Sequence, residues 1–309
     1  MDVYGLGTLA VDVLMKVDHL PGKDSFCVVE ESVRQPGGSG TNAIVQAARL
    51  GASCGYIGAV GDDGLGKDVL ESLQKENVDT GSMVIKPGKT TLHTDIVIDR
   101  SGDKFIMLNM GDAFLELCCE ETDLDAVAGA KVFYTDLLPY APALEALKTA
   151  RANGVKTVFN LQVGLDTMEG MGISREDILN ALPYADVFAP CRDGLYALTD
   201  TQDMDRCAEI LRKYCDGLLI FTKGKEGSVA YGRDGRCYKA DTYPVKAVDT
   251  TGAGDSYIGS FLVARYLKGW DVQKSMEFAS VCAGYTCSGI GARFSPDYDT
   301  AWKIFTERK

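Results

Sequence analysis

Short apolar segments alternate with amphipathic ones along the middle third of the chain. Segments rich in β-branched and aromatic side chains predict buried strands at Val132–Thr135, Thr157–Leu161, Asp186–Ala189 and Leu218–Thr222. Apolar residues at helical spacing predict helices between them, at Ala143–Ala152, Arg175–Leu182, Gly194–Leu198 and Met204–Tyr214. Because alternating strands and helices form parallel sheets that carry helices on both faces, we expect a doubly wound α/β fold with a mostly parallel central sheet.

The first third of the chain adds extended ribbons to this pattern. It predicts further strands and helices at Val3–Gly7, from Gly37–Asn42 to Gly51, at Ser53–Ala59 and at Asp62–Asn77. Alternation from Val11 to Val33, and a hairpin pattern in Thr91–Asp99 with Lys104–Asn109, indicate exposed β-ribbons. No linker, repeat or low-complexity segment divides the chain. We therefore expect one domain over residues 1–309, with a small β-sheet lid formed by about residues 9–33 and 91–109.

Composition narrows the classes of function. The formal net charge of −12 argues against non-specific binding of nucleic acid, which requires a basic surface. No apolar run is long enough to span a bilayer and no secretory leader is recognisable, so we expect a cytoplasmic protein without a membrane partner. Ten cysteines without a Cys-x-x-Cys pair are expected to be reduced thiols. The two histidines, His19 and His93, argue against a histidine zinc site or a Ser-His-Asp hydrolase.

The segment from Asp249 to Tyr257 carries the strongest indication of chemistry. It follows a predicted hairpin, Ser228–Tyr231 with Arg236–Ala240, and it opens an apolar-periodic helix. Glycines expose consecutive backbone N–H groups and a helix start adds partial positive charge, so the turn predicts an anion cradle. A carboxylate at Asp255 beside such a cradle is the minimum equipment for moving a phosphoryl group to a hydroxyl. The alternative is that Asp255 merely caps the helix.

Three other glycine-rich segments compete for this role. Gly5–Ala10 matches a dinucleotide fingerprint, but alternating β-branched residues follow it instead of a helix, which argues against a dehydrogenase. Gly61–Asp68 has the spacing of a Walker A loop, but Asp68 replaces the Ser or Thr that would bind magnesium, so a capped helix start is the better interpretation. Gly37–Asn42 offers small polar groups suited to the hydroxyls of a polyol, or is an ordinary helix start.

Two of these turns occur in a fixed order, Gly37-Gly38…Asn42…Arg49-Leu50-Gly51 and then Asp249-Thr250-Thr251-Gly252-Ala253-Gly254-Asp255. This order resembles both signatures of the ribokinase-like, or PfkB, carbohydrate kinases, and the resemblance covers almost the whole chain. Supporting segments also match, namely Gly7 with Asp12, Gly58–Gly66, and Thr222-Lys223-Gly224 with Gly227. The resemblance implies a ribokinase-like fold and an ATP-dependent kinase that acts on a hydroxyl, with Mg²⁺ and, as in many relatives, K⁺.

The resemblance also implies roles for individual residues. Asp255 corresponds to the general base, and the backbone of Gly252, Ala253 and Gly254 to an anion hole for the transferring phosphoryl group. The candidate substrate-binding residues are Asp12, Gly38, Ser39, Asn42, His93 and Asp136. The candidate nucleotide-binding residues are Thr222, Gly224, Gly227, Ala283 and Ser288, and the surroundings of Asp249, Thr251 and Gly291 resemble a monovalent-cation site.

The chain departs from the family pattern after the strand that ends near Ala189. Relatives often carry Asn-x-x-Glu there, a motif associated with magnesium and phosphate. Here Cys191 stands in place of the Asn and no Glu follows, which leaves Asp193 as a candidate replacement. The departure concerns the binding of magnesium and phosphate.

The acceptor is a second point at which the chain departs from the ribokinases proper. Ser39 and Thr41 differ from the residues typical of that turn, which weakens ribose as the substrate. The basic residues near the expected cleft, Arg34, Arg100, Lys104 and Arg293, form no cluster in the sequence. A neutral sugar, sugar derivative or nucleoside is therefore favoured over a sugar phosphate. A sugar-phosphate kinase and a catalytically silent sugar-binding relative remain as alternatives, and a homodimer through the open edges of the lid is expected.

Overall fold

The computed structural model describes residues 1–101 and 103–307, so Gly102 of the predicted hairpin turn lies outside the described residues. A mostly parallel sheet has the strand order β14-β13-β12-β11-β10-β9-β1-β4-β5, with β6 paired to β4. The strands are β1 (Val3–Leu6), β4 (Cys54–Gly61), β5 (Val78–Asp79), β6 (Met83–Lys86), β9 (Val132–Thr135), β10 (Lys156–Phe159), β11 (Val187–Phe188), β12 (Leu218–Thr222), β13 (Ser228–Tyr231) and β14 (Cys237–Ala240). The pairs β12–β13 and β13–β14 are antiparallel, and the others in this sheet are parallel.

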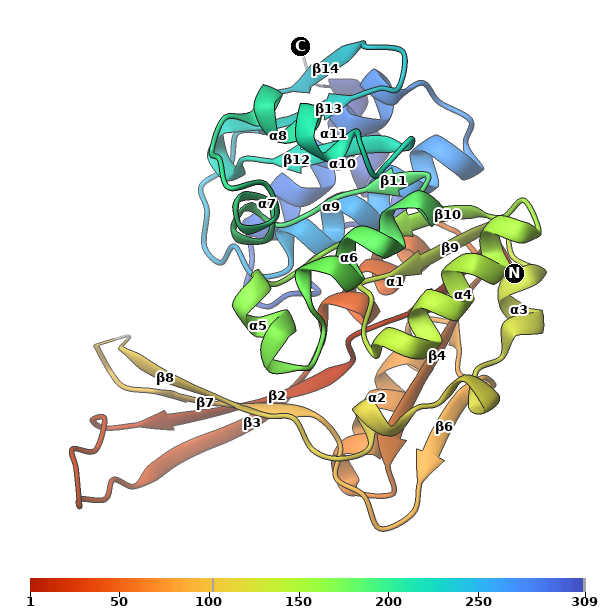
Figure 1. Ribbon diagram of the computed structural model, residues 1–309. Coiled ribbons are helices and arrows are strands. Elements are labelled where there is room, and N and C mark those ends of the chain that lie inside the picture. The colour runs from red at the N-terminus through yellow and green to blue at the C-terminus, as the bar shows by residue number, and fades with distance from the viewer. Residues whose placement is uncertain (102, 308–309) are drawn as a thin grey trace.

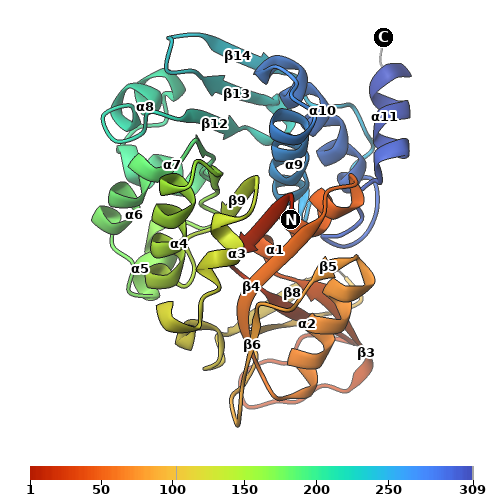
Figure 2. The ribbon, with the colours of Figure 1, turned by 90° about the vertical axis from the view of Figure 1, so that its right-hand side faces the viewer.

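Helices cover both faces of the sheet, as expected from the alternating pattern. Figure 2 shows one group on one side: α3 (Leu124–Ala128), α4 (Tyr140–Ala152), α5 (Leu165–Gly170), α6 (Arg175–Ala181), α7 (Arg192–Thr199) and α8 (Met204–Leu211). The other side carries α1 (Ser39–Arg49), α9 (Ala253–Leu262), α10 (Val272–Cys287) and α11 (Tyr298–Glu307). Helix α2 (Gly64–Lys75) follows β4 and packs against it. The predicted fold class is confirmed.

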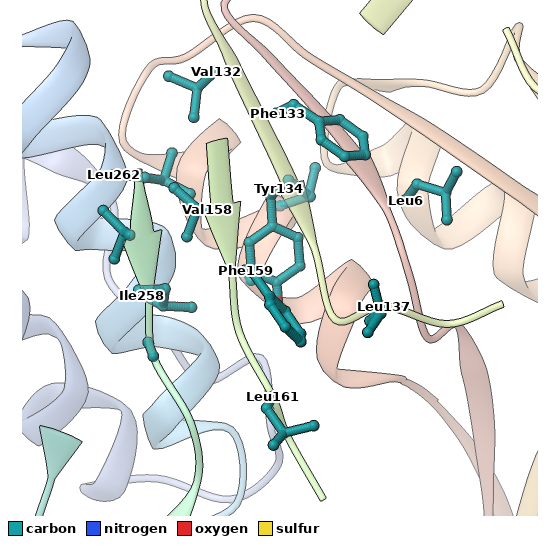
Figure 3. Close-up of a cluster of buried hydrophobic side chains, with 14 of the residues drawn as sticks. Leu6, Val132, Phe133, Tyr134, Leu137, Val158, Phe159, Leu161, Ile258 and Leu262 are labelled. Atoms are coloured by element: carbon teal, nitrogen blue, oxygen red, sulfur yellow. The ribbon is translucent and has the colours of Figure 1, made fainter. Parts of the chain in front are cut away.

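The apolar core anchors α9 to the central strands. Figure 3 shows Ile258 and Leu262 of α9 among the side chains of Val158 and Tyr134 from β10 and β9. Residues four positions apart lie on one face of a helix, so this face is buried against the sheet. The first turn of α9 is thereby held near the carboxyl ends of the parallel strands, which is where open α/β sheets bind their ligands.

A second sheet of four strands projects from this body, as Figure 1 shows. Its order is β3-β2-β7-β8, formed by β2 (Ala10–Val17), β3 (Val29–Gly37), β7 (His93–Ile98) and β8 (Lys104–Asn109). The predicted ribbon from Val11 to Val33 is two strands with a strand-free connection between them. Strand β3 also continues to Gly37, because its pairing with β2 extends to Ala10 opposite Gly37.

The pattern missed several short elements, namely β5, β6, α3 and α5, and it gave no bounds for α11. These elements have two to six residues, apart from α11, and are too short for a period to be recognised. Within residues 1–101 and 103–307, none of the helices is both long and apolar enough to cross a membrane.

Candidate active site

The glycine-rich turn before α9 has Gly252 as its capping residue. Gly252 adopts a positive φ of 76°, and a Cβ atom there would lie 2.2 Å from the carbonyl oxygen of Ala292. Helix α9 begins at Ala253, and Asp255 is its third residue, with no side-chain hydrogen bond that caps the helix. The interpretation of Asp255 as a simple helix cap is therefore wrong, and its carboxylate is directed elsewhere.

The carboxylate of Asp255 contacts the start of α1. The side chain is 5% exposed, and Nδ2 of Asn42 donates to its Oδ2 at 3.0 Å. Burial raises the pKa of Asp255 to about 7, with a smaller rise from Asp136, while hydrogen bonds from Asn42 and Ser39 and the charge of Arg293 lower it. A carboxyl group that titrates near neutral pH can both take up and release a proton under physiological conditions.

The turn before α1 supplies the other side of this site. Gly38 has a φ of 87° and lies so close to the chain at Leu9 that a Cβ atom would be 2.6 Å from its Cα. The hydroxyl of Thr41 donates to the carbonyl of Gly37 at 2.6 Å. This tight turn brings Ser39 and Asn42 to Asp255, so three of the predicted residues come together.

Asp12 faces the same turn from β2. A Cβ atom on Gly37 would lie 2.7 Å from Oδ2 of Asp12, so glycine permits this close approach. Burial raises the pKa of Asp12, against a hydrogen bond from Thr94 and the charge of Arg293, which lower it. Asp12 is therefore an acidic group beside Gly37, at the turn that begins α1.

His93 and Asp136 are placed differently from the other candidates. In the second sheet Val11 pairs with His93, and Asp12 pairs with Thr94, so His93 and Asp12 lie on opposite faces. Asp136 is 1% exposed, and its two oxygens accept hydrogen bonds from the N–H groups of Thr8 at 2.8 Å and Leu138 at 3.2 Å. Its pKa is raised to about 6 by burial. Asp136 thus fastens the chain after β1, and the structure does not bring His93 to Asp12.

Two adjoining cavities lie beside the first turn of α9. The first, of about 540 Å³, is lined by the predicted Thr222, Gly224, Gly227 and Ala283, together with Ala253 and Gly254. The second, of about 350 Å³, shares Thr222, Gly224 and Gly254 with it. A Cβ atom on Gly254 would meet nothing within 4 Å, so the backbone there is open to both cavities. Ser288 does not line either cavity and instead donates to the carbonyl of Tyr285 at 2.6 Å.

Sequence reasoning missed part of the lining. The segment from Tyr243 to Ala247 contributes to the first cavity, and Asn160, Gln162 and Arg192 contribute to the second. None of these residues stands in a repeated or glycine-rich pattern that could have identified it. The hairpin that precedes Tyr243 was the only local indication, because it returns the chain toward β12.

The segment with the missing Asn-x-x-Glu borders the second cavity. Cys191 caps α7 by accepting a hydrogen bond from the N–H of Gly194 at 3.3 Å. Arg192 and Asp193 line the cavity, and a Cβ atom on Gly224 would lie 3.8 Å from an Nη atom of Arg192. A guanidinium group therefore stands next to the glycine turn after β12.

Asp249 ties the α9 turn to the loop after α10. Its Oδ2 accepts a hydrogen bond from the N–H of Gly291 at 2.9 Å, and its Oδ1 accepts from the N–H and hydroxyl of Thr251. The three residues of the predicted cation site are thus adjacent. Within the described part of the chain, no group of three or more His, Cys, Asp and Glu side chains is arranged to hold a metal ion.

Comparison with known proteins identifies the family. Residues 2–299 match the pfkB family carbohydrate kinase. A 5-dehydro-2-deoxygluconokinase of Clostridium perfringens is 29% identical over 93% of this chain and 88% of that protein. A nucleoside kinase of Methanothermobacter thermautotrophicus is 27% identical over 99% and 96%. The fold is similar to that of a ribokinase from Thermotoga maritima, with a TM-score of 0.85, 23% identity and 100% of both chains covered. The chain belongs to the pfkB family of carbohydrate kinases, and it is a phosphotransferase.

Proposed function

We propose that this kinase transfers the γ-phosphoryl group of ATP to a hydroxyl, preferably a primary one, of a small sugar, sugar derivative or nucleoside. Asp255 is the general base, and the backbone of Gly252, Ala253 and Gly254 forms the anion hole. One observation carries the proposal: a carboxylate with a pKa of about 7 stands in the first turn of a helix whose Gly254 borders both cavities.

The proposed residues divide the reaction between them. As the acceptor oxygen forms its bond to the γ-phosphorus, its proton passes to Asp255 and the bond to the β-phosphate oxygen breaks, which releases ADP. N–H groups in the first turn of a helix lack intrahelical acceptors, and they stabilise the negative charge on the phosphoryl oxygens. Because one turn carries both the base and these N–H groups, the reacting groups are held in register.

The two cavities suit the two ends of a nucleotide. The first is lined by apolar side chains such as Pro244, Val245 and Ala283, which suit the adenine ring. The second is less apolar than the first and includes Arg192 and Asp193, which suit the phosphates and their hydrated Mg²⁺. Arg192 takes a phosphate-binding role in this proposal, and carbonyl oxygens of the turn of Asp249 and Thr251 with Gly291 would hold K⁺.

The charges around Asp255 favour a neutral acceptor. Asp12 and Asp255 are acidic, and Asp136 lies close enough to raise the pKa of Asp255. The basic candidates are engaged: Arg34 pairs with Asp68 at 3.0 Å and Arg100 pairs with Glu30. Lys104 acts on Asp249, since its charge lowers the pKa of that carboxyl. The fourth candidate, Arg293, is engaged by Asn42 and Thr41, to which it donates hydrogen bonds. An anionic acceptor would therefore meet carboxylates before it met a cation with free donors.

The projecting sheet is the lid of this site and the surface through which two copies pair. On the face that carries Asp12, the register also places the aliphatic residues Leu14, Val33, Ile96, Ile98, Ile106 and Leu108. Ile106 is 57% exposed and Leu108 55%. Strands β3 and β8 leave open edges, and a second copy of this chain would cover both the edge and the apolar face.

The cytoplasm is the proposed location of this kinase.

A nucleoside acceptor is the second candidate, favoured by the small side chain at Ser39 beside Asp255, which leaves room for a base. A catalytically silent sugar-binding protein is the alternative of a different class. The burial of Asp255 argues against it, since a binding protein gains nothing from a desolvated carboxylate beside an anion site.

The test is ADP release from ATP–Mg²⁺ over a panel of neutral sugars, sugar acids, sugar phosphates and nucleosides, with and without K⁺. We expect a neutral sugar or nucleoside to raise the rate far above the hydrolysis background. A preference for an anionic acceptor would overturn the acceptor class, and a flat panel with ATP still bound would support the silent relative.

A further inference from the structure

Arg293, in the loop between α10 and α11, forms an unusual set of contacts. Its Nε donates to Oδ1 of Asn42 at 3.0 Å, and one Nη donates to the hydroxyl of Thr41 at 3.1 Å. The remaining contacts, at 3.3 and 3.4 Å, are to the hydroxyl of Ser72 and the carbonyl of Gly37. Among the described residues no carboxylate forms an ion pair with it. Burial lowers the pKa of Arg293 to about 10, so it remains charged at neutral pH.

A desolvated cation without a paired carboxylate is costly, so its retention needs a reason. Stabilisation of the fold is a weak reason, because neutral side chains could fill the same space without the desolvation cost. Arg49, which lies nearby, shows the ordinary arrangement, since it pairs with Glu76. Arg293 instead directs its donors at the turn that begins α1.

The contact with Asn42 fixes the orientation of that amide. An Asn side chain has an acceptor oxygen and a donor nitrogen, which exchange places if the amide is turned over. With Oδ1 held by Arg293, Nδ2 is directed at Asp255 and donates to it at 3.0 Å. In the opposite orientation the amide oxygen would face the carboxylate and the amide nitrogen would face the guanidinium, and both contacts would be repulsive.

We propose that Arg293 is a positioning residue for phosphoryl transfer: it locks the Asn42 amide toward Asp255 and supplies the positive charge that this buried carboxylate otherwise lacks. The inference rests on the proposed role of Asp255 as the base. Its consequence is that a residue in the loop between α10 and α11 controls the orientation and charge environment of the base. It does so through a relay of two hydrogen bonds, from Arg293 to Asn42 and from Asn42 to Asp255.

Other ionisable groups lie near this relay, and their titration must be distinguished from that of Asp255 in a pH profile. They are Asp12, Arg49, Tyr56, Glu76, Tyr134 and Asp136. Burial raises the pKa values of Tyr56 and Tyr134 well above the usual range, so both stay neutral. Glu76 stays ionised, because its bond to Arg49 lowers its pKa. The groups that titrate near neutral pH are therefore Asp255, with a pKa of about 7, and Asp136, with a pKa of about 6. Burial also raises the pKa of Asp12.

The test compares Arg293→Met and Arg293→Lys with the wild type in the pH profile of kcat/KM for the acceptor. Arg293→Met is expected to move the midpoint upward by about 1 pH unit, because an attractive charge is lost. Arg293→Lys keeps the charge and is expected to hold the midpoint while kcat falls about 10-fold, because Nε no longer orients Asn42. Arg212→Met is the control, since Arg212 donates to the carbonyls of Cys215, Gly217 and Tyr231.

A merely structural role would lower the melting temperature of both Arg293 variants and leave the midpoint of Arg293→Met and the kcat of Arg293→Lys at their wild-type values, which would overturn the inference. If Arg293→Met does not fold, the kcat of Arg293→Lys decides alone. Failure of the proposed function is recognised separately, because full turnover in Asp255→Asn would overturn the assignment of Asp255 as the base. If Asp255→Asn is inactive while the midpoint of Arg293→Met and the kcat of Arg293→Lys keep their wild-type values, only the role of Arg293 is overturned.

Discussion

Nδ2 of Asn42 donates to Oδ2 of Asp255 at 3.0 Å and joins the starts of two helices that are 213 positions apart in the chain. The same two helices approach closely along their length, since a Cβ atom on Gly259 of α9 would lie 2.3 Å from the carbonyl oxygen of Ala43 in α1. The two glycine-rich turns of the sequence are therefore one site, with the buried base at their junction.

The ionisation of Asp255 predicts a rising pH profile. Burial raises the pKa of this carboxyl from 3.8 to about 7, so it is protonated and inactive as a base below that value. We expect kcat/KM for the acceptor to increase with pH through a midpoint near 7 at saturating ATP. A profile that stays flat between about pH 5.5 and 8.5 would contradict the assignment.

The same shift makes a prediction for stability. Because the folded-state pKa of Asp255 lies above its unfolded value, the carboxyl group stabilises the folded state only while it is protonated, and this contribution is lost as the pH rises from about 4 to 7. Asp255→Asn removes the ionisation. The melting temperature of Asp255→Asn minus that of the wild type should therefore be higher at about pH 8 than at about pH 5. The same difference at both pH values would count against a raised pKa.

Substitution by alanine should have different effects at two glycines of the α9 turn, on stability at Gly252 and on ATP binding at Gly254. Gly252→Ala forces a positive φ and a 2.2 Å contact with Ala292, so it should lower the free energy of unfolding by about 1 kcal/mol or more. Gly254→Ala meets nothing in the protein and should leave stability within about 0.5 kcal/mol, yet raise KM for ATP by crowding the cavities. An unchanged KM for ATP in Gly254→Ala would contradict the anion hole.

Arg192 should act on the nucleotide. If its guanidinium contacts the phosphates, Arg192→Ala should raise KM for ATP about 10-fold or more, as loss of a charge-assisted hydrogen bond does. Arg206→Ala is the matched control, because Arg206 is an exposed arginine on α8 that pairs with Glu209. An unchanged KM for ATP in both variants would show that the second cavity does not hold the phosphates through Arg192.

The apolar face of the second sheet should set the oligomeric state. Ile106→Ser combined with Leu108→Ser removes exposed aliphatic groups from the face that carries Asp12, and should convert a dimer to a 33.3 kDa monomer by light scattering. Met107 is comparably exposed but lies on the opposite face, so Met107→Ser should remain dimeric. A wild-type protein that is already monomeric would remove the proposed interface.

The sequence was informative where a local pattern carries the structure. Strands β9 and β12 and helix α9 have a continuous apolar period, and the glycine turns at Gly38 and Gly252 have the positive φ angles that made glycine necessary. Ser39 and Asn42 lie beside Asp255 because the tight turn at Gly38 brings the start of α1 to the start of α9.

Other features had no local pattern to read. The two residues of β5 acquire their strand only by pairing with β4, and Asp136 is identified as a backbone anchor only by its contacts with Thr8 and Leu138. The opposite faces of Asp12 and His93 follow from the register of two strands distant in sequence. The contact of Arg293 with Asn42 spans 251 positions. A single arginine in a loop has no period or motif, so only the fold could show what it touches.

The most direct test of the account is the turnover of Asp255→Asn with the best acceptor, measured together with ATP binding and the melting temperature. We predict that kcat falls by about 10²-fold to 10⁴-fold, which is the range contributed by a general base, while ATP still binds and the fold is kept. Turnover comparable to that of the wild type would contradict the central claim that Asp255 removes the proton from the acceptor.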